Sequence, residues 1–292
     1  MRRLAIAVAA SATAIVVAGG GQAQAQAAPV PSPVKSVKAQ LVPGRGVLIS
    51  ETARATYTGI KGTFSVKTMG SVGFGRAGNT DYDLVSRNQI SPEARKLFSE
   101  KDLERLRVTV HTIKVGRHTY VSGLRPDREG EDWLRFGGNV TWGEKGQRGS
   151  QLLDVLDPAV LRKLITKAVS PRPGEYQGTI TTRELYGART WGLDVRKLSY
   201  RLFVNADQLP VRLVTESSQK TTVVLREGDK PVRRTEHDVV DTRYHAWGTR
   251  VTITAPSESE AVTAGSLMTQ LFTPLSPIPI GPAGTPDANR PR

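Results

Sequence analysis

The chain has 292 residues, no cysteine, and 41 lysines and arginines against 27 acidic residues, which gives a formal net charge of +14. The absence of cysteine excludes a disulfide framework and excludes a lipid attached to an N-terminal cysteine. A chain without such links must be held together by its own apolar core.

The first 27 residues have the three-part layout of a secretory signal peptide. Arg2 and Arg3 precede an apolar run over residues 4–18, and small residues follow as far as Ala25-Gln26-Ala27. Residues 23–25 offer a second site of the same A-x-A form. The apolar run is shorter than the roughly 20 residues that a transmembrane helix needs. We therefore expect cleavage after residue 27 and a secreted, extracytoplasmic protein of the cell envelope that is not lipid-anchored.

Proline is concentrated at both ends of the remaining chain. Four prolines fall within residues 28–43 and six within residues 273–292, with almost no apolar periodicity around them. Such segments favour extended linkers and tails. We predict a signal peptide over residues 1–27, a Pro-rich linker over 28–43, a single domain over 44–272 and a disordered Pro-rich tail over 273–292.

Strand patterns dominate residues 44–272. In residues 198–204, the apolar side chains of Leu198, Tyr200 and Leu202 share one face, as in a sheet that is covered on one side. Short turns such as Gly116-Arg117 join neighbouring strands and favour an antiparallel meander. The predicted strands cover residues 60–71, 108–115, 119–121, 177–185, 198–205, 211–217, 220–226, 232–244 and 251–254.

Three segments carry helix-start signals. Ser91-Pro92 and Asp157-Pro158 each place a capping side chain before a proline at the first helical position. Ser257 and Glu260 have the spacing of a capping box before residues 261–272. Many antiparallel strands with about three helices that cover one face indicate an α+β fold.

No motif in the sequence indicates catalysis. Residues 73–78 have the glycine spacing of a dinucleotide fingerprint, but no helix start follows, so we interpret them as a glycine-rich hairpin or loop. The four histidines have no metal-ligand spacing, and no G-x-S-x-G elbow occurs. We expect no catalytic residue, no metal, no cofactor and no enzymatic activity.

An aromatic and leucine-rich region is the strongest candidate for a ligand site. In one interpretation it is an ordinary core, with a helix packed on a sheet. In the other, sheet and helix face each other across a cleft that is open to an apolar ligand. The candidate cleft residues are Tyr120, Trp133, Phe136, Trp142, Leu153, Leu156, Leu161, Leu164 and Ile165.

The order of several segments resembles that of a known family. The segments are residues 108–121, Trp133-Leu134-Arg135, residues 156–161, residues 204–212, and residues 244–256 with their Trp247-Gly248 and Ala255-Pro256 pairs. Together they resemble the LppX/LprG-type, LolA-like secreted proteins and lipoproteins of actinobacteria. The resemblance implies a strongly curved antiparallel half-barrel with helices on its concave face, around a space that receives acyl chains in characterised relatives. Those relatives are mostly lipidated at a cysteine, which this chain lacks.

Two functions remain open from the sequence. The first is a non-catalytic carrier or binding protein for a lipid or other amphiphile outside the cytoplasm, acting as a monomer. The second is a sensor or interaction module of the same fold that binds a cell-wall polymer or a protein without lipid transport. The positive charge serves solubility alone or favours an anionic membrane surface or cell-wall polymer as a partner; nucleic acid is not expected outside the cytoplasm.

Overall fold

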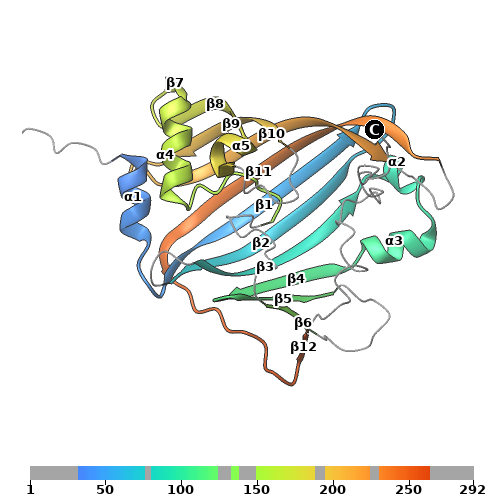
Figure 1. Cartoon of the computed structure of the whole chain (residues 1–292), viewed down its shortest axis with the longest axis horizontal. Helices are drawn as coiled ribbons and strands as arrows, with labels where there is room; N and C mark the ends of the chain where they lie inside the picture. Colours follow the sequence, from blue (N-terminus) through green and yellow to red (C-terminus); the bar gives the residue numbers. More distant parts are fainter. Residues whose placement is uncertain are drawn as a thin grey trace, which may run out of the picture. The chain divides into compact units, whose positions relative to one another are not determined.

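Twelve strands and five helices make up the described part of the chain (Figure 1). The computed structural model describes residues 32–75, 80–123, 133–137, 149–187, 195–223 and 230–263, which all belong to one compact unit, residues 31–292. The strands are β1 (Arg45–Tyr57), β2 (Phe64–Phe74), β3 (Thr80–Ile90), β4 (Thr109–Val115), β5 (His118–Ser122), β6 (Trp133–Phe136), β7 (Val169–Arg172), β8 (Glu175–Thr181), β9 (Lys197–Val204), β10 (Pro210–Val223), β11 (Val232–Arg250) and β12 (Ala261–Thr263). The helices are α1 (Pro33–Gln40), α2 (Pro92–Arg95), α3 (Glu100–Leu106), α4 (Pro158–Lys167) and α5 (Thr182–Tyr186).

All twelve strands belong to one open sheet. Their order is β12-β6-β5-β4-β3-β2-β1-β11-β10-β9-β8-β7, so β12 and β7 are its two edges. Neighbouring strands are antiparallel except β12 and β6, which run parallel. The predicted α+β class, a mainly antiparallel sheet with a few helices, is confirmed at this level.

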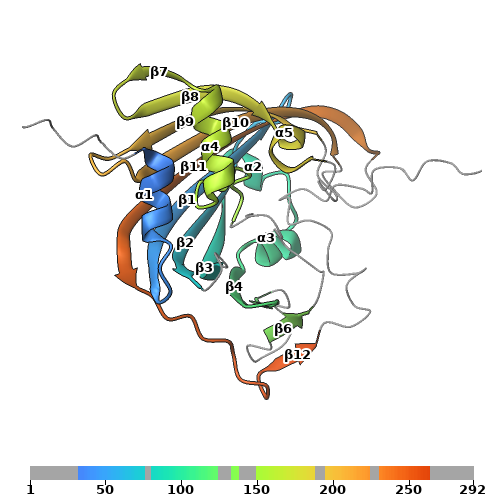
Figure 2. The ribbon, with the colours of Figure 1, turned by 60° about the vertical axis from the view of Figure 1, so that its left-hand side comes forward.

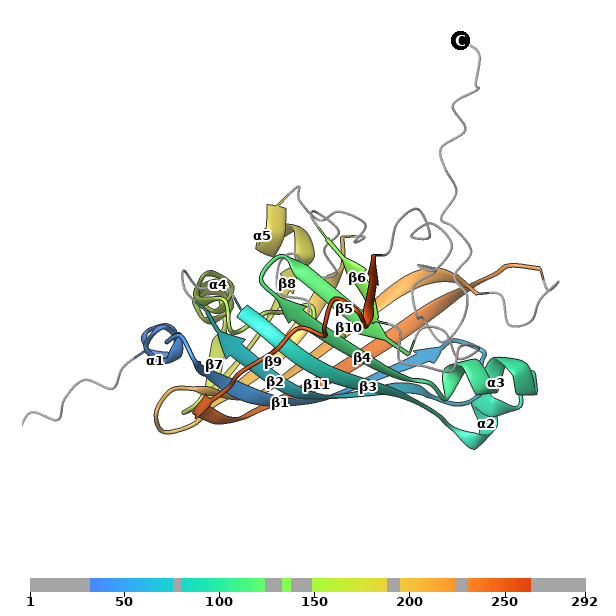
Figure 3. The same ribbon diagram turned by 90° about the horizontal axis from the view of Figure 1, so that it is seen from below.

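The sheet is bent across its strands (Figures 2 and 3). Both edges rise on the same side of the central strands β1, β2 and β11, and α4 and α5 lie on that side. We call this side the concave face and the opposite side the convex face. Side chains alternate between them: Val47, Ile49 and Glu51 of β1 are buried on the concave face, whereas Arg54 on the convex face is exposed.

The main core lies between α1, α4 and the concave face. Leu153, Leu161 and Leu164 are fully buried there against Leu202 and Leu213 of the sheet. The periodicity of α4 accounts for this, because its apolar residues fall on one helical face. Its capping residue is Asp157, which accepts a hydrogen bond from Ala159 N over 2.7 Å, as the sequence predicted.

Residues 33–40 form α1, so the prediction of an extended linker over residues 28–43 is wrong for this segment. Ser32 caps the helix by accepting a hydrogen bond from Lys35 N over 3.4 Å, and Pro33 occupies its first turn. Proline is tolerated there because the N–H that it lacks would have no helical partner. Val37 is fully buried in the main core and anchors the helix.

Residues 261–263 form β12, so the helix predicted to begin at residue 261 is wrong for them. Ser257 and Glu260 do make a capping contact, in which Ser257 Oγ donates to Glu260 Oε2 over 2.6 Å. The same contact also closes a turn, and the following residues pair with the exposed edge of β6. Residues 264–272 lie outside the described residues, as do the predicted signal peptide (1–27) and tail (273–292).

Several strand predictions also need correction. The predicted strand 211–217 and residues 220–223 of the next predicted strand belong to the single strand β10, and residues 224–226 lie outside the described residues. The predicted strand 177–185 ends early, because Thr181 and Glu184 form a capping box that starts α5. Residues 251–254 form no strand, and β1, β3, β6 and β7 were not predicted.

Candidate functional site: a cavity on the concave face

The apolar end of the concave face is filled. Leu153, Leu161 and Leu164 have no exposed surface, Leu156 is 3% exposed, and Ile165 packs against the same core. The structure therefore brings these five candidate cleft residues together, but as a packed core. For this region, the described residues favour the ordinary-core interpretation of the sequence over an open cleft.

The candidate aromatic residues do not join that cluster. Tyr120 and Trp133 belong to a separate cluster with Ile113, which residues 253–261 cover on the convex face. Phe136 lies three residues after Trp133 on β6 and therefore points to the concave face, because side chains alternate along a strand. Trp142 lies outside the described residues. A single cleft lined by all the predicted residues is thus not formed.

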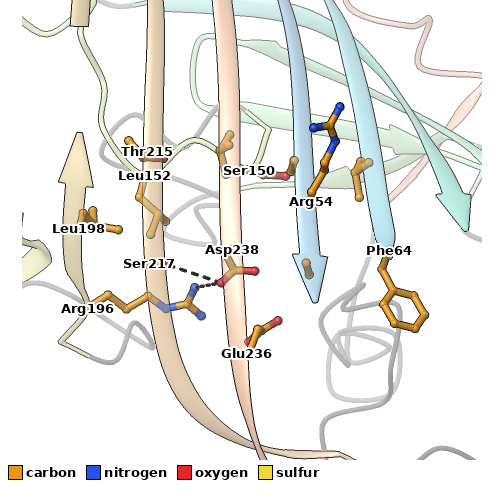
Figure 4. Close-up of a pocket in the computed structure, with 14 residues that line it drawn as sticks. Arg54, Phe64, Ser150, Leu152, Arg196, Leu198, Thr215, Ser217, Glu236 and Asp238 are labelled. Atoms are coloured by element: carbon orange, nitrogen blue, oxygen red, sulfur yellow. Dashed lines mark hydrogen bonds and ion pairs between the residues drawn. The ribbon is translucent and has the colours of Figure 1, made fainter. Parts of the chain in front are cut away.

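A cavity does lie on the concave face, farther along the strands from α4 (Figure 4). Its volume is about 190 Å³, and Figure 4 shows the residues that line it. The side chains form successive rows across the sheet: Val66, Ala53, Val240 and Thr215 in one row, and Phe64, Ala55, Asp238, Ser217 and Leu198 in the next. The remaining lining residues are Ser150, Leu152, Arg196 and Glu236, together with Arg54, which lies between Ala53 and Ala55 on β1 and whose side chain alternation places on the convex face.

Three charged side chains lie at one end of the cavity. Glu236 and Asp238 are two positions apart on β11 and therefore share the concave face. Arg196, just before β9, donates from Nη1 to Asp238 Oδ2 over 3.4 Å, and Ser217 reaches the same oxygen over 3.5 Å (Figure 4). The main chain of Arg196 is fixed by two hydrogen bonds with buried Thr182, over 2.9 and 3.1 Å.

The three charges differ in how fully they are satisfied. Glu236 accepts hydrogen bonds on both oxygens, from Tyr57 over 2.7 Å and from Gln219 over 2.6 Å. Burial raises the pKa of Asp238 to about 6, the charge of Glu236 adds to the rise, and Arg196 acts against it. The Nε of Arg196 is buried and has no hydrogen-bond partner among the described residues. The hydrogen-bonding capacity of the Arg196 guanidinium is therefore only partly used.

A buried polar network separates this cavity from the filled core. Glu51 is 3% exposed and accepts hydrogen bonds from Ser150 N over 2.7 Å and from Thr242 over 3.0 Å. Gln151 connects Thr242 with Thr215 through contacts of 3.2 and 3.1 Å. These contacts fix the segment before Leu153 across the sheet. Burial raises the pKa of Glu51 to about 7, although the hydrogen bonds from Ser150 and Thr242 oppose that rise.

Sequence reasoning did not identify this site. The alternation of residues 232–244 could have placed Glu236 and Asp238 on one face, since that strand was predicted. Arg196 carries no comparable signal, because it lies outside any predicted strand and pairs with a residue 42 positions away. Ala53 and Ala55 belong to β1, which was not predicted.

The lining of the cavity offers groups that can bind a ligand. In the described part of the chain, histidine, aspartate and glutamate side chains form no cluster that could hold a metal ion. No helix among the described residues is long and apolar enough to cross a bilayer. The chain matches no protein-family model and no curated protein.

Proposed function

We propose that the protein is a non-catalytic, extracytoplasmic binding protein for a small amphiphile. The observation that carries this proposal is the concave cavity, which is apolar at Phe64, Val66 and Leu198 and charged at Arg196 and Asp238. An apolar wall with a few polar groups that orient the ligand is the usual composition of a small-molecule site. The LolA-like resemblance of the sequence supports the same class of function, although the ligand site lies away from the α4 leucines.

The cavity volume limits the part of the ligand that enters it. About 190 Å³ exceeds a cavity of roughly 150 Å³ that is known to hold benzene, so one ring or a short alkyl segment fits. Arg196 lines the cavity, and its guanidinium can donate to an acceptor on the ligand. Asp238 provides an acceptor for a donor on the same head group. A primary amide carries both functions.

The first experiment measures binding of straight-chain primary amides of increasing length by calorimetry. We expect the affinity to rise by about 0.8 kcal/mol for each methylene group that becomes buried, and to level off once the cavity is full. Native mass spectrometry of protein recovered from its own host should show a bound small amphiphile. An affinity that is independent of chain length, together with ligand-free native protein, would contradict the proposal.

A matched pair of variants locates the site. Ala53→Leu adds bulk inside the cavity, whereas Thr52→Leu adds a similar side chain to the opposite face of β1. We expect Ala53→Leu to weaken amide binding at least about tenfold, because the cavity has little room to spare, and Thr52→Leu to leave it unchanged. Equal affinities for the two variants would place the ligand elsewhere.

The filled core around Leu161 favours a second candidate function. A concave face that is closed by α4 suits an extracytoplasmic interaction module with the same fold, which binds a polymer or a protein through its outer surface. Such a module does not need the cavity to be empty. If the protein is such a module, the wild type and Ala53→Leu should bind the partner with equal affinity. If it is an amphiphile carrier, Ala53→Leu should bind its ligand more weakly than the wild type.

A further inference from the structure

The convex face carries a band of cations across six neighbouring strands, of which Arg212 is half-buried and the others are exposed. Alternation places them on one face of β3, β2, β1, β11, β10 and β9, in three consecutive rows of cross-strand pairs. We call this band the convex basic strip; its members are Arg54, Lys67, Arg87, Arg201, Arg212 and Arg243.

The strip places like charges directly opposite each other. Lys67 of β2 pairs with Arg87 of β3, and Arg212 of β10 pairs with Arg243 of β11. Like charges at directly paired positions destabilise a sheet. For Lys67 and Arg87, which form no ion pair with another described residue, folding alone gives no reason for cations at both positions, and this points to a partner that neutralises them.

Few carboxylates compensate the strip. The same three rows between β3 and β9 contain two, Asp241 and Glu216. Asp241 is occupied by Arg212, which donates from Nε and Nη2 over 2.9 and 2.7 Å. Lys67, Arg87 and Arg243 form no ion pair with another described residue. Their charge is therefore available to a partner.

We infer that the convex basic strip binds a linear, flexible polyanion. Six strands at about 4.8 Å spacing give the strip a width of roughly 24 Å, and the sheet bends over that width (Figure 3). A flat bilayer would contact only the strands at the crest of such a bend. A flexible chain of phosphates or carboxylates can follow the bend and meet the five cations of the strip that Asp241 does not neutralise. This inference is independent of the ligand in the concave cavity, and it supplies a partner chemistry for the interaction-module function.

The test uses the full chain with long-chain polyphosphate as the probe. Lys67→Gln combined with Arg87→Gln removes one like-charge pair from the strip. Arg162→Gln combined with Arg183→Gln removes the same charge from exposed positions on α4 and α5. We expect the strip variant to bind at least about tenfold more weakly at low salt and to lose between one and two units of the salt-dependence slope. The helix variant should change affinity less than about twofold.

The melting temperature distinguishes a binding role of the Lys67–Arg87 pair from a structural one. If the pair stabilised the sheet, its removal would lower the melting temperature. Removing the like-charge pair should leave the melting temperature unchanged or raise it by about 1–2 °C, while it weakens binding. A melting temperature that falls together with the affinity would contradict the inference, because the pair would then stabilise the sheet.

Two further outcomes would overturn it. If both double variants weaken polyphosphate binding equally, the net charge of the molecule is responsible and the strip is not a site. If the protein binds vesicles that contain anionic phosphatidylglycerol but not polyphosphate, the partner is a membrane. Ala53→Leu should bind polyphosphate like the wild type, so failure of the amphiphile proposal would not be mistaken for failure of this one.

Discussion

The two ends of the concave face differ in what covers the sheet. At one end, α1 and α4 bring leucine and valine side chains onto the strands, and Tyr200 donates a hydrogen bond to the Leu164 carbonyl over 2.6 Å. At the other end, the strands carry Ala53 and Ala55 beside charged Asp238, and a cavity remains. The same bent sheet is therefore solid where large apolar side chains meet and hollow where small side chains lie beside charges that are costly to desolvate.

Leu161→Ala tests the filled end and should have the largest effect. Leu161 is fully buried in the main core, so its truncation leaves a cavity that its neighbours fill only partly. We expect the free energy of unfolding to fall by about 2–5 kcal/mol, measured by chemical denaturation. The exposed neighbour Arg162 provides the control, since Arg162→Ala should change stability by less than about 0.5 kcal/mol.

A loss below about 1 kcal/mol for Leu161→Ala would mean that the interior around α4 is already loose. The filled and hollow ends would then not differ as described. Such a result would also restore the apolar cleft around α4 as a ligand site.

The sequence predicted the fold class well because strand alternation and helix capping are local signals. β9 and α4 were recognised from such signals, and the leucines of α4 were correctly expected to face the sheet. β1 was missed because Glu51 occupies a position where alternation calls for an apolar residue. The LolA-like identity of the bent sheet stays a prediction, since it came from the resemblance of scattered segments.

The candidate site was predicted less well because it depends on long-range pairing. Asp238 pairs with Ala55 on one side and with Ser217 on the other. The register between strands that are distant in sequence cannot be predicted from local periodicity. Tyr120 and Trp133 were grouped with the leucines because they are near in sequence. Residues 253–261 cover them on the opposite face instead.

Glu51→Gln tests the polar boundary between the two ends. The ordinary pKa of 4.5 is raised to about 7 in the folded protein, so between these values the folded state keeps a proton that the unfolded state releases. Glu51 therefore lowers stability progressively as the pH rises through this window. We expect the free energy of unfolding of Glu51→Gln, relative to that of the wild type, to increase by up to about 3 kcal/mol between pH 4 and pH 8. Denaturation at a series of pH values measures this difference.

Thr242→Val sharpens the same test. The Thr242 hydroxyl donates to Glu51 and lowers its pKa. Without this donor the pKa of Glu51 should rise further, and the decline in stability should extend to higher pH. A difference between Glu51→Gln and the wild type that is constant over the whole pH range would show that folding does not raise the pKa of Glu51.

Arg196→Met tests the hollow end, with the smallest expected effect. Arg196 lowers the pKa of Asp238, which burial and Glu236 raise from 3.8 to about 6. Removal of Arg196 should raise the pKa of Asp238 further. Above about pH 6 the folded state would then still hold a proton that the unfolded state has lost, so the variant should be destabilised in that range. We expect a stability loss at pH 8 that exceeds the loss at pH 5 by about 1 kcal/mol. Arg196→Lys keeps the positive charge and should recover part of the difference, whereas equal losses at both pH values would assign to Arg196 a packing role alone.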